Sequence, residues 1–144
     1  MSPAPALSAN PLEQAVLAAN RRFYAAFESL DLAEMEEVWL HEDWVACVHP
    51  GWNLMLGWDE VRDSWARIFS STQRLRLAMS SIWAHVEGDV AWIACTEHVT
   101  SLFTGGFDET HVQATNLFIL RGGAWRMAAH HASPLAITRE PSVQ

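Results

Sequence analysis

The chain has 144 residues, half of them hydrophobic, and a formal net charge of -8. This length fits one domain, and the apolar content is enough to build a core without metals or disulfides. The nine basic residues are arginines spread along the chain, so no basic stripe predicts nucleic-acid binding. The sequence has neither a signal-peptide pattern nor an apolar run long enough to span a membrane, so we expect a soluble cytoplasmic protein.

The two cysteines, Cys47 and Cys95, lie far apart in the sequence, within apolar segments that resemble strands. They lack the close spacing of a Cys-x-x-Cys redox pair or of a set of metal ligands. We therefore expect two buried, reduced thiols rather than a disulfide, and we expect neither a metal nor a cofactor.

The first part of the chain predicts a helical hairpin. Asn10 followed by proline is typical of a helix N-terminus. Apolar residues then recur at three- and four-residue steps to about Ser29 and form one apolar stripe. Asp31 can cap a second, shorter helix over about 32–40, whose first turn is acidic. A third helix is expected to begin at Asp59.

A short apolar strand at 44–48 leads into His49, which is followed by a proline-glycine bend and flanked by Trp44 and Trp52. A titratable imidazole at a strand end, beside aromatic surface, is typical of a small-molecule pocket. The alternative is a histidine whose ring is satisfied by the turn backbone alone. We favour the pocket because binding residues concentrate on the loops at strand ends.

The second half of the chain is rich in β-forming residues, and glycine-containing breaks divide it into four segments. This pattern predicts an antiparallel meander, and helices followed by a meander indicate an α+β fold. A strongly curved sheet folded partly around the helices would form a cone with a cavity at its wide end. We expect one domain over 11–136, between disordered tails at 1–10 and 137–144. The expected strands cover about 74–87, 90–103, 109–120 and 124–133.

Asn116 interrupts an apolar strand, where an inward-facing amide needs a partner or a ligand. If the last hairpin turns through residues 122–124, Asn116 lies opposite His130, whereas a two-residue turn places it opposite Ala129. We favour His130 over His131 as the histidine inside the cone. Asn116 and His130 then form either a structural polar pair or a direct contact to a ligand.

Three segments of the chain match one known fold in their order and spacing. They are Phe-Tyr-Ala-Ala-Phe-Glu-Ser-Leu-Asp-Leu at 23–32, Val-His-Pro at 48–50 followed by Gly57 and Trp65, and Gly-Ala-Trp-Arg at 123–126 leading to His-Ala-Ser at 131–133. On these segments the chain resembles the NTF2-like superfamily, and more closely its SnoaL-like branch, which is related to ketosteroid isomerases and the calcium/calmodulin-dependent kinase association domain. The resemblance implies a cone-shaped α+β fold, a homodimer that pairs through the outer face of the sheet, and a pocket inside the cone.

The resemblance also implies roles for residues in that pocket. His49 falls where ketosteroid isomerases place an aspartate general base and where association domains place a glutamate. Phe23 falls where the isomerases place the tyrosine that donates to the developing oxyanion, and Tyr24 is one helical step of about 100° away. Ala94 and Asn116 fall where association domains place two arginines, so the resemblance implies a neutral or weakly polar pocket rather than an anion site.

One of the long strands should present a face to this pocket. Under simple alternation, Trp92, Thr96 and His98 share a face with Ala94, and we expect that face to see the cavity. Glu97 would then lie on the outer face, in solvent or in a dimer interface.

We therefore expect a small-molecule-binding SnoaL-like protein that acts as a cofactor-independent isomerase or lyase and uses His49 for proton transfer. The alternative is a non-catalytic association module that resembles the kinase association domain. The expected partners are a small, largely apolar organic ligand and a second copy of the chain, but neither nucleic acid nor a membrane. An open cavity lined by His49 favours the enzyme, whereas a filled cone and an apolar outer face favour the module. The expected ligand contacts are Tyr24, Trp52, Trp92, Thr96, Asn116 and His130.

Overall fold

The helices begin and end close to the positions that the sequence predicts. Asn10 caps the first helix, because its side-chain oxygen accepts a 2.8 Å hydrogen bond from the Glu13 amide. Asp31 caps the second helix in the same way, through the Ala33 amide at 3.0 Å. The helices of residues 10–135 are α2 (Pro11–Ser29), α3 (Leu32–Val38) and α4 (Trp58–Ser71).

The computed structural model describes residues 10–135. The tails that the sequence predicts at 1–10 and 137–144 therefore lie outside the described residues, apart from Asn10. No helix in the described part of the chain combines the length and the apolar character that crossing a membrane requires.

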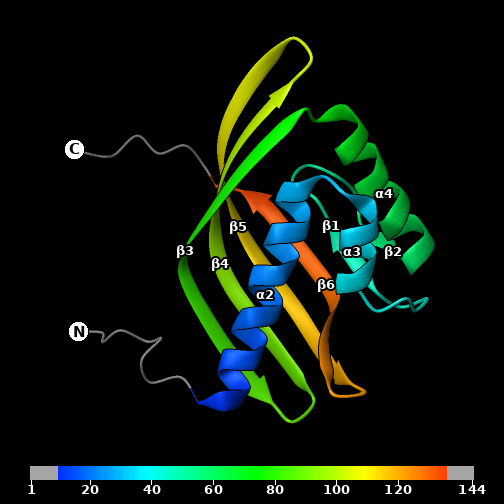
Figure 1. The fold of residues 1–144 in the computed structure, drawn as a ribbon, viewed down its shortest axis with the longest axis vertical. Helices are drawn as coiled ribbons and strands as arrows, with labels where there is room; N and C mark the ends of the chain where they lie inside the picture. Colours follow the sequence, from blue (N-terminus) through cyan, green and yellow to red (C-terminus); the bar gives the residue numbers. More distant parts are fainter. Residues whose placement is uncertain (1–9, 136–144) are drawn as a thin grey trace.

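The six strands of the described residues join one sheet, in the order β2-β1-β6-β5-β4-β3 (Figure 1). The four long strands form the predicted antiparallel meander. The sheet as a whole is mixed, because β1 pairs in parallel with β6 and places Cys47 opposite His130. The strands are β1 (Ala46–Val48), β2 (Met55–Leu56), β3 (Arg74–Glu87), β4 (Val90–Phe103), β5 (Gly106–Arg121) and β6 (Ala124–Pro134).

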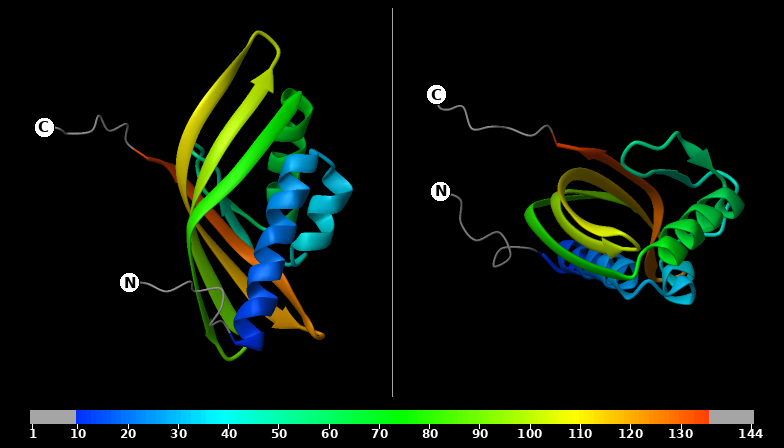
Figure 2. Two further views of the ribbon diagram at one scale, coloured as in Figure 1. Left: turned by 60° about the vertical axis from the view of Figure 1, so that its left-hand side comes forward. Right: turned by 90° about the horizontal axis from the view of Figure 1, so that it is seen from above.

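The sheet is curved, and the helices lie on its concave side. Figure 2 shows the long strands curling around α2, with the β4–β5 hairpin projecting beyond the helices. The register of β3 against β4 shifts between Ser80 and Trp83, and Ser81 between them has a φ of 52°. Because a bulge bends its strand and increases the local twist, this irregularity helps to close the sheet around the helices.

A second bulge sets the register of the last hairpin. The turn consists of two residues, 122–123, and this turn alone would place Asn116 opposite Ala129. Ala128 is an extra residue in β6, so the register shifts by one and Asn116 lies opposite His130. The predicted pairing of Asn116 with His130 is confirmed, but it arises from this bulge and not from a three-residue turn.

The concave side holds both the apolar core and a set of buried polar side chains. Phe23, Trp65 and Phe118 are fully buried there. Buried polar groups need hydrogen-bond partners, so their arrangement indicates where a site has been built. The buried polar residues are Asn20, His49, Ser64, Glu97, Asn116 and His130.

Candidate functional site

A cavity of about 350 Å³ lies between α2, α4 and the concave face of the sheet. Its deep end is polar, since His49, Glu97 and His130 line it and are each at most 2% exposed. Its open end is formed by exposed residues of the β4–β5 hairpin and of β6. This volume lies near the lower limit for small-molecule sites. The apolar walls are Phe27, Trp52, Ile68, Leu75, Val99 and Val112.

His49 follows β1 directly and carries its hydrogen on Nε2. This nitrogen is 2.9 Å from Ser64 Oγ, and Ser64 donates its own hydrogen to the Val61 carbonyl at 2.6 Å. A hydroxyl has only one hydrogen, so Ser64 must accept from His49. Nδ1 of His49 therefore carries a lone pair, and the thiol of Cys47, a weak donor, lies 3.9 Å from it. Trp52 and Trp65 pack edge-to-face against the ring, at centroid distances of 5.0 and 4.6 Å.

His49 is neutral at physiological pH. Burial, and then the charge of Arg67, lower the pKa of His49 from its usual value of 6.5 to about 4. The guanidinium of Arg67 lies 4.8 Å above the ring of Trp52, which holds the cation close to the histidine. His49 can therefore accept a hydrogen bond over the whole physiological pH range, but it is a weak base.

A chain of hydrogen bonds joins Glu97 to His130. Tyr24 of α2 donates to Glu97 Oε2 at 2.6 Å, and the amide nitrogen of Asn116 donates to the Tyr24 hydroxyl at 3.1 Å. Asn116 Oδ1 lies 2.6 Å from His130 Nδ1. Asn116 also donates to Asn20 Oδ1 at 2.9 Å. Asn116 is thus not a lining residue of the cavity but connects two that are, because it bonds directly to His130 and reaches Glu97 through Tyr24.

The direction of this chain fixes the tautomer of His130. An ionised Glu97 can only accept, so Tyr24 must donate to it and accept from Asn116. The carbonyl oxygen of Asn116 then faces His130, whose Nδ1 must carry the hydrogen. Burial, followed by the proximity of His49 and His131, lowers the pKa of His130 well below its usual value. His130 is therefore neutral. Its Nε2 carries a lone pair, for which the described residues supply no recorded hydrogen-bond donor.

Glu97 is the buried cavity-lining residue that reasoning from the sequence missed. It was expected on the outer face of the sheet, but it is 2% exposed and lines the deep end of the cavity. Burial raises the pKa of Glu97 from 4.5 to about 7, and the hydrogen bond from Tyr24 acts in the opposite direction. A carboxyl group that titrates near neutral pH is suited to proton transfer. Glu97 is thus a second candidate for the proton transfer that the sequence analysis assigns to His49.

The prediction of which β4 side chains face the cavity was wrong, because it chose the opposite set of alternate residues. Ile93, Cys95 and Glu97 are buried on the concave side, so Trp92 and Thr96 lie on the outer face, away from the cavity. Thr96 bonds there to the side chain of Gln113, the Trp92 ring packs against Trp83 and His85, and the His98 ring packs against His111.

The physical reason lies in the space available beneath α2. The hydroxyl of Tyr24 occupies part of that space and lies 3.4 Å from Cys95 Sγ, so the β4 residue at this contact has a small side chain. Strand alternation separates two faces but does not say which one is buried. The run of Ala91, Ile93 and Cys95 at every second position was the signal for the concave face.

Phe23 and Tyr24 have different surroundings on α2. The ring of Phe23 is fully buried and packs against His130 and Trp65, at centroid distances of 4.9 and 5.8 Å. Tyr24 reaches the cavity only through Glu97, since its hydroxyl is used within the hydrogen-bond chain. The Tyr24 hydroxyl therefore orients the carboxylate of Glu97 and does not face the cavity itself.

Both cysteines are buried free thiols, as the sequence predicts. Cys47 Sγ lies 3.7 Å from Nε2 of His49, and Cys95 contacts Tyr24. Burial raises the pKa of both thiols, and the charge of Glu97 adds to this effect. Because the thiolate is the reactive form, neither cysteine is prepared to act as a nucleophile.

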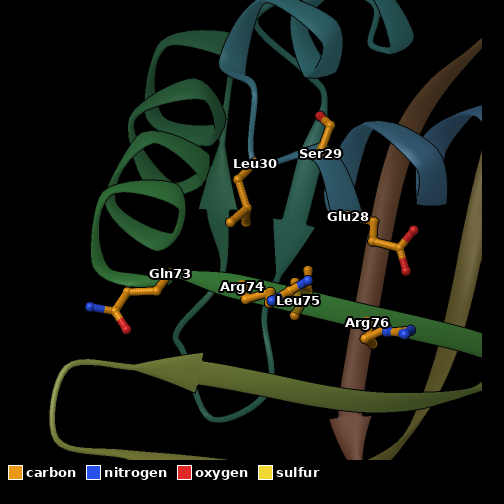
Figure 3. Close-up of a pocket in the computed structure, with 7 residues that line it drawn as sticks. All are labelled: Glu28, Ser29, Leu30, Gln73, Arg74, Leu75 and Arg76. Carbon is orange, nitrogen blue, oxygen red and sulfur yellow. The ribbon is translucent and has the colours of Figure 1, made fainter.

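A second hollow, of about 380 Å³, lies at the junction of the α2 C-terminus and the start of β3. Figure 3 shows Glu28, Arg74 and Arg76 around it. The carboxylate of Glu28 accepts a 2.9 Å hydrogen bond from the Leu77 amide, so it serves to attach the helix to the strand. We assign this hollow a structural role. In the described part of the chain, no three His, Cys, Asp or Glu residues are grouped so as to hold a metal ion.

The fold and the cavity together define a cone-shaped α+β domain with a ligand-sized site on the concave side of its sheet. Residues 16–138 match the SnoaL-like domain family, and the chain belongs to that family. The resemblance to the NTF2-like superfamily that the sequence indicates is thereby confirmed.

Several solved structures share this fold. A proposed dehydratase of the NTF2-like family from Streptomyces avermitilis is 33% identical, with 87% of this chain and 96% of that chain covered and a TM-score of 0.82. A proposed calcium/calmodulin-dependent protein kinase type II association domain from Thiobacillus denitrificans is 33% identical, with 83% and 94% covered and a TM-score of 0.74. A curated relative, the F-box protein SKIP8 of Arabidopsis thaliana, is 27% identical over 124 residues. The alignment covers 86% of this chain and 51% of SKIP8, so the chain spans about half the length of that relative.

Proposed function

We propose that this protein binds a small, largely apolar organic molecule in the cavity and moves a proton on it without a cofactor, as an isomerase or a lyase. The observation that carries the proposal is the position of Glu97, a buried carboxyl with a pKa of about 7 at the deep end of an apolar cavity. The similarity to a proposed dehydratase over most of both chains supports the lyase.

Glu97 and His49 have complementary roles in this proposal. A group transfers protons best when its pKa is close to the working pH, and such a group accelerates a reaction by about 10²–10⁴-fold. Glu97 meets this condition, so we assign it the removal and the return of the proton. The lone pair of His49 accepts a hydrogen bond from a hydroxyl of the ligand and orients it. In a dehydration, Glu97 removes the proton next to the carbonyl and passes it to the leaving hydroxyl, which departs as water. Tyr24 keeps the carboxylate of Glu97 oriented, because its hydroxyl lies 2.6 Å from Oε2.

The proposal can be tested by hydrogen exchange on simple substrates. A panel of small cyclic β-hydroxy ketones is incubated with the protein in heavy water, and NMR follows deuterium incorporation and loss of the hydroxyl group. We expect catalysis by the wild type and a reduction of at least about a hundredfold for Glu97→Gln. Glu87→Gln, which removes an exposed carboxylate at the end of β3, is the matched control. Equal rates for Glu97→Gln and Glu87→Gln would remove Glu97 from the mechanism.

The alternative function, a non-catalytic association module, is favoured by the outer face of the sheet. Trp83 is 51% exposed there and packs against His85 and Trp92, which gives this face an aromatic patch. We propose that this patch lies in a homodimer interface, and the two functions are compatible. Light scattering should show that Trp83→Glu converts a dimer into a monomer, whereas Leu54→Glu, at an exposed loop position, leaves the dimer intact. An open cavity lined by His49 favours the enzyme over a purely associative role.

A further inference from the structure

The three buried polar groups of the cavity share one property, which is that each has a hydrogen-bond acceptor left. His49 uses its Nε2 hydrogen for Ser64, so its Nδ1 carries a lone pair, near which the weakly donating thiol of Cys47 lies at 3.9 Å. His130 uses its Nδ1 hydrogen for Asn116, so only the Nε2 lone pair is available. One oxygen of Glu97 accepts from Tyr24, and the lone pairs of the other oxygen are left.

The two imidazoles cannot easily exchange these roles. Reversing His49 would place two acceptors, Nε2 and the Ser64 oxygen, 2.9 Å apart, because the Ser64 hydrogen belongs to the Val61 carbonyl. Reversing His130 would require the amide of Asn116 to turn over, which would break its bonds to Asn20 and Tyr24. The fold thus fixes two opposite tautomers, and both leave an acceptor.

The charges around the cavity also favour a neutral hydrogen-bond donor over an anionic ligand. Among the described residues that line it, none is an arginine, whereas Asp108 at the open end adds a second carboxylate to that of Glu97. Arg67 lies over Trp52, outside the set of lining residues. A carboxylate or phosphate ligand would therefore meet like charge and lone pairs without a compensating guanidinium.

We propose that the cavity selects neutral alcohols or phenols, which donate a hydroxyl hydrogen to His49 or His130 from an apolar body, over ethers and carboxylates of the same shape. The inference rests on the proposed function for the binding of a small molecule, but it does not depend on the proton transfer. When an alcohol enters the cavity, its hydroxyl hydrogen bonds to one of these imidazole lone pairs. An ether of equal size leaves that acceptor buried and unpaired, which lowers its affinity.

Matched aromatic probes test this selectivity by calorimetry. Naphthol, the corresponding methoxynaphthalene and the corresponding naphthoate share one ring system and differ only in the polar group. At about pH 8, where Glu97 is mostly ionised, we expect naphthol to bind at least about tenfold more tightly than the other two. In Glu97→Gln the preference over naphthoate should fall, since the repelling carboxylate is gone, whereas Glu87→Gln should behave as the wild type.

The outcomes separate this inference from the proposed function. Binding of all three probes with equal affinity, or a preference for the ether or for naphthoate, overturns the selectivity and leaves the binding function intact. Failure of every probe to bind overturns both. Ring-nitrogen chemical shifts provide an independent measurement that needs no ligand, and we expect the Nε2–H tautomer for His49 and the Nδ1–H tautomer for His130. The Nε2–H tautomer at His130 would contradict the hydrogen-bond chain and overturn the selectivity.

Discussion

Tyr24 and Glu97, which are 73 positions apart in the sequence, form a buried hydrogen bond of 2.6 Å between α2 and β4. Phe23 occupies the position where the family resemblance implies a hydroxyl, and its ring packs against His130 instead. The hydroxyl of Tyr24 is directed one helical step away, toward a carboxylate that lines the cavity. The site therefore combines a phenol and a carboxyl group in one unit that can carry a proton.

Tyr24→Phe should raise the pKa of Glu97 above about 7. The hydrogen bond from Tyr24 stabilises the ionised carboxylate, so its removal leaves burial as the dominant effect. Any rate that depends on ionised Glu97 should then rise at a higher pH than in the wild type. The variant also loses about 1–2 kcal/mol of stability, because Asn116 loses an acceptor. Infrared titration of the carboxyl band measures the shift, and an unchanged titration would show that Tyr24 does not hold the carboxylate.

Glu97→Gln should stabilise the protein at alkaline pH. A carboxyl whose folded-state pKa is raised contributes stability that is fully present below its unfolded pKa of 4.5 and is lost as the pH rises through about 7. At about pH 8 we expect the glutamine variant to have a free energy of unfolding that is higher by about 1–3 kcal/mol. Well below pH 4.5 the two proteins should be equally stable, because Glu97 is then neutral in both the folded and the unfolded chain.

Urea unfolding at several pH values measures this difference. His49 acts with the opposite sign, since its lowered pKa gives stability that is present above 6.5 and is lost as the pH falls through about 4. Its contribution is common to both proteins and cancels in the comparison. A glutamine variant that is less stable than the wild type at about pH 8 would mean that the ionised carboxylate is not costly to bury.

Asn116→Ala should lower the free energy of unfolding by about 1–3 kcal/mol, because it leaves His130 and Tyr24 without their partner. It should also release the tautomer of His130, which a ring-nitrogen chemical shift reports directly. Thr115→Ala is the matched control, since Thr115 is the exposed neighbour on the same strand. Its effect should stay within about 0.5 kcal/mol. Equal losses from the two variants would mean that the amide of Asn116 contributes nothing beyond strand propensity.

The elements of this fold could be predicted where their signals are local. The caps at Asn10 and Asp31 depend on side chains next to the helix that they start, so the sequence indicates them directly. The parallel pairing of β1 with β6 has no local signal, because it joins strands that are separated by most of the chain. Contacts of this kind follow from the packing of the whole domain.

In the candidate site, too, features with a local sequence signal could be predicted and features set by long-range packing could not. The position of His49 at a strand end was readable, and so was the need of Asn116 for a partner. The pairing with His130 was reached through the wrong turn length, since the bulge at Ala128 has no distinctive residue. The role of Glu97 was missed because a charged residue is expected in solvent, and because the face of β4 depends on what α2 places beneath it.

Arg67→Leu should raise the pKa of His49 above about 4, because the guanidinium is the second cause of its depression. The change should be modest, since burial is the first cause and the ring stays enclosed between Trp52 and Trp65. Histidine ring signals followed by NMR measure the titration, and Trp52 fluorescence should change as the cation leaves its ring. Arg62→Leu is the control, since Arg62 pairs with Glu36 instead. A pKa of His49 that is unchanged in Arg67→Leu would assign the whole depression to burial.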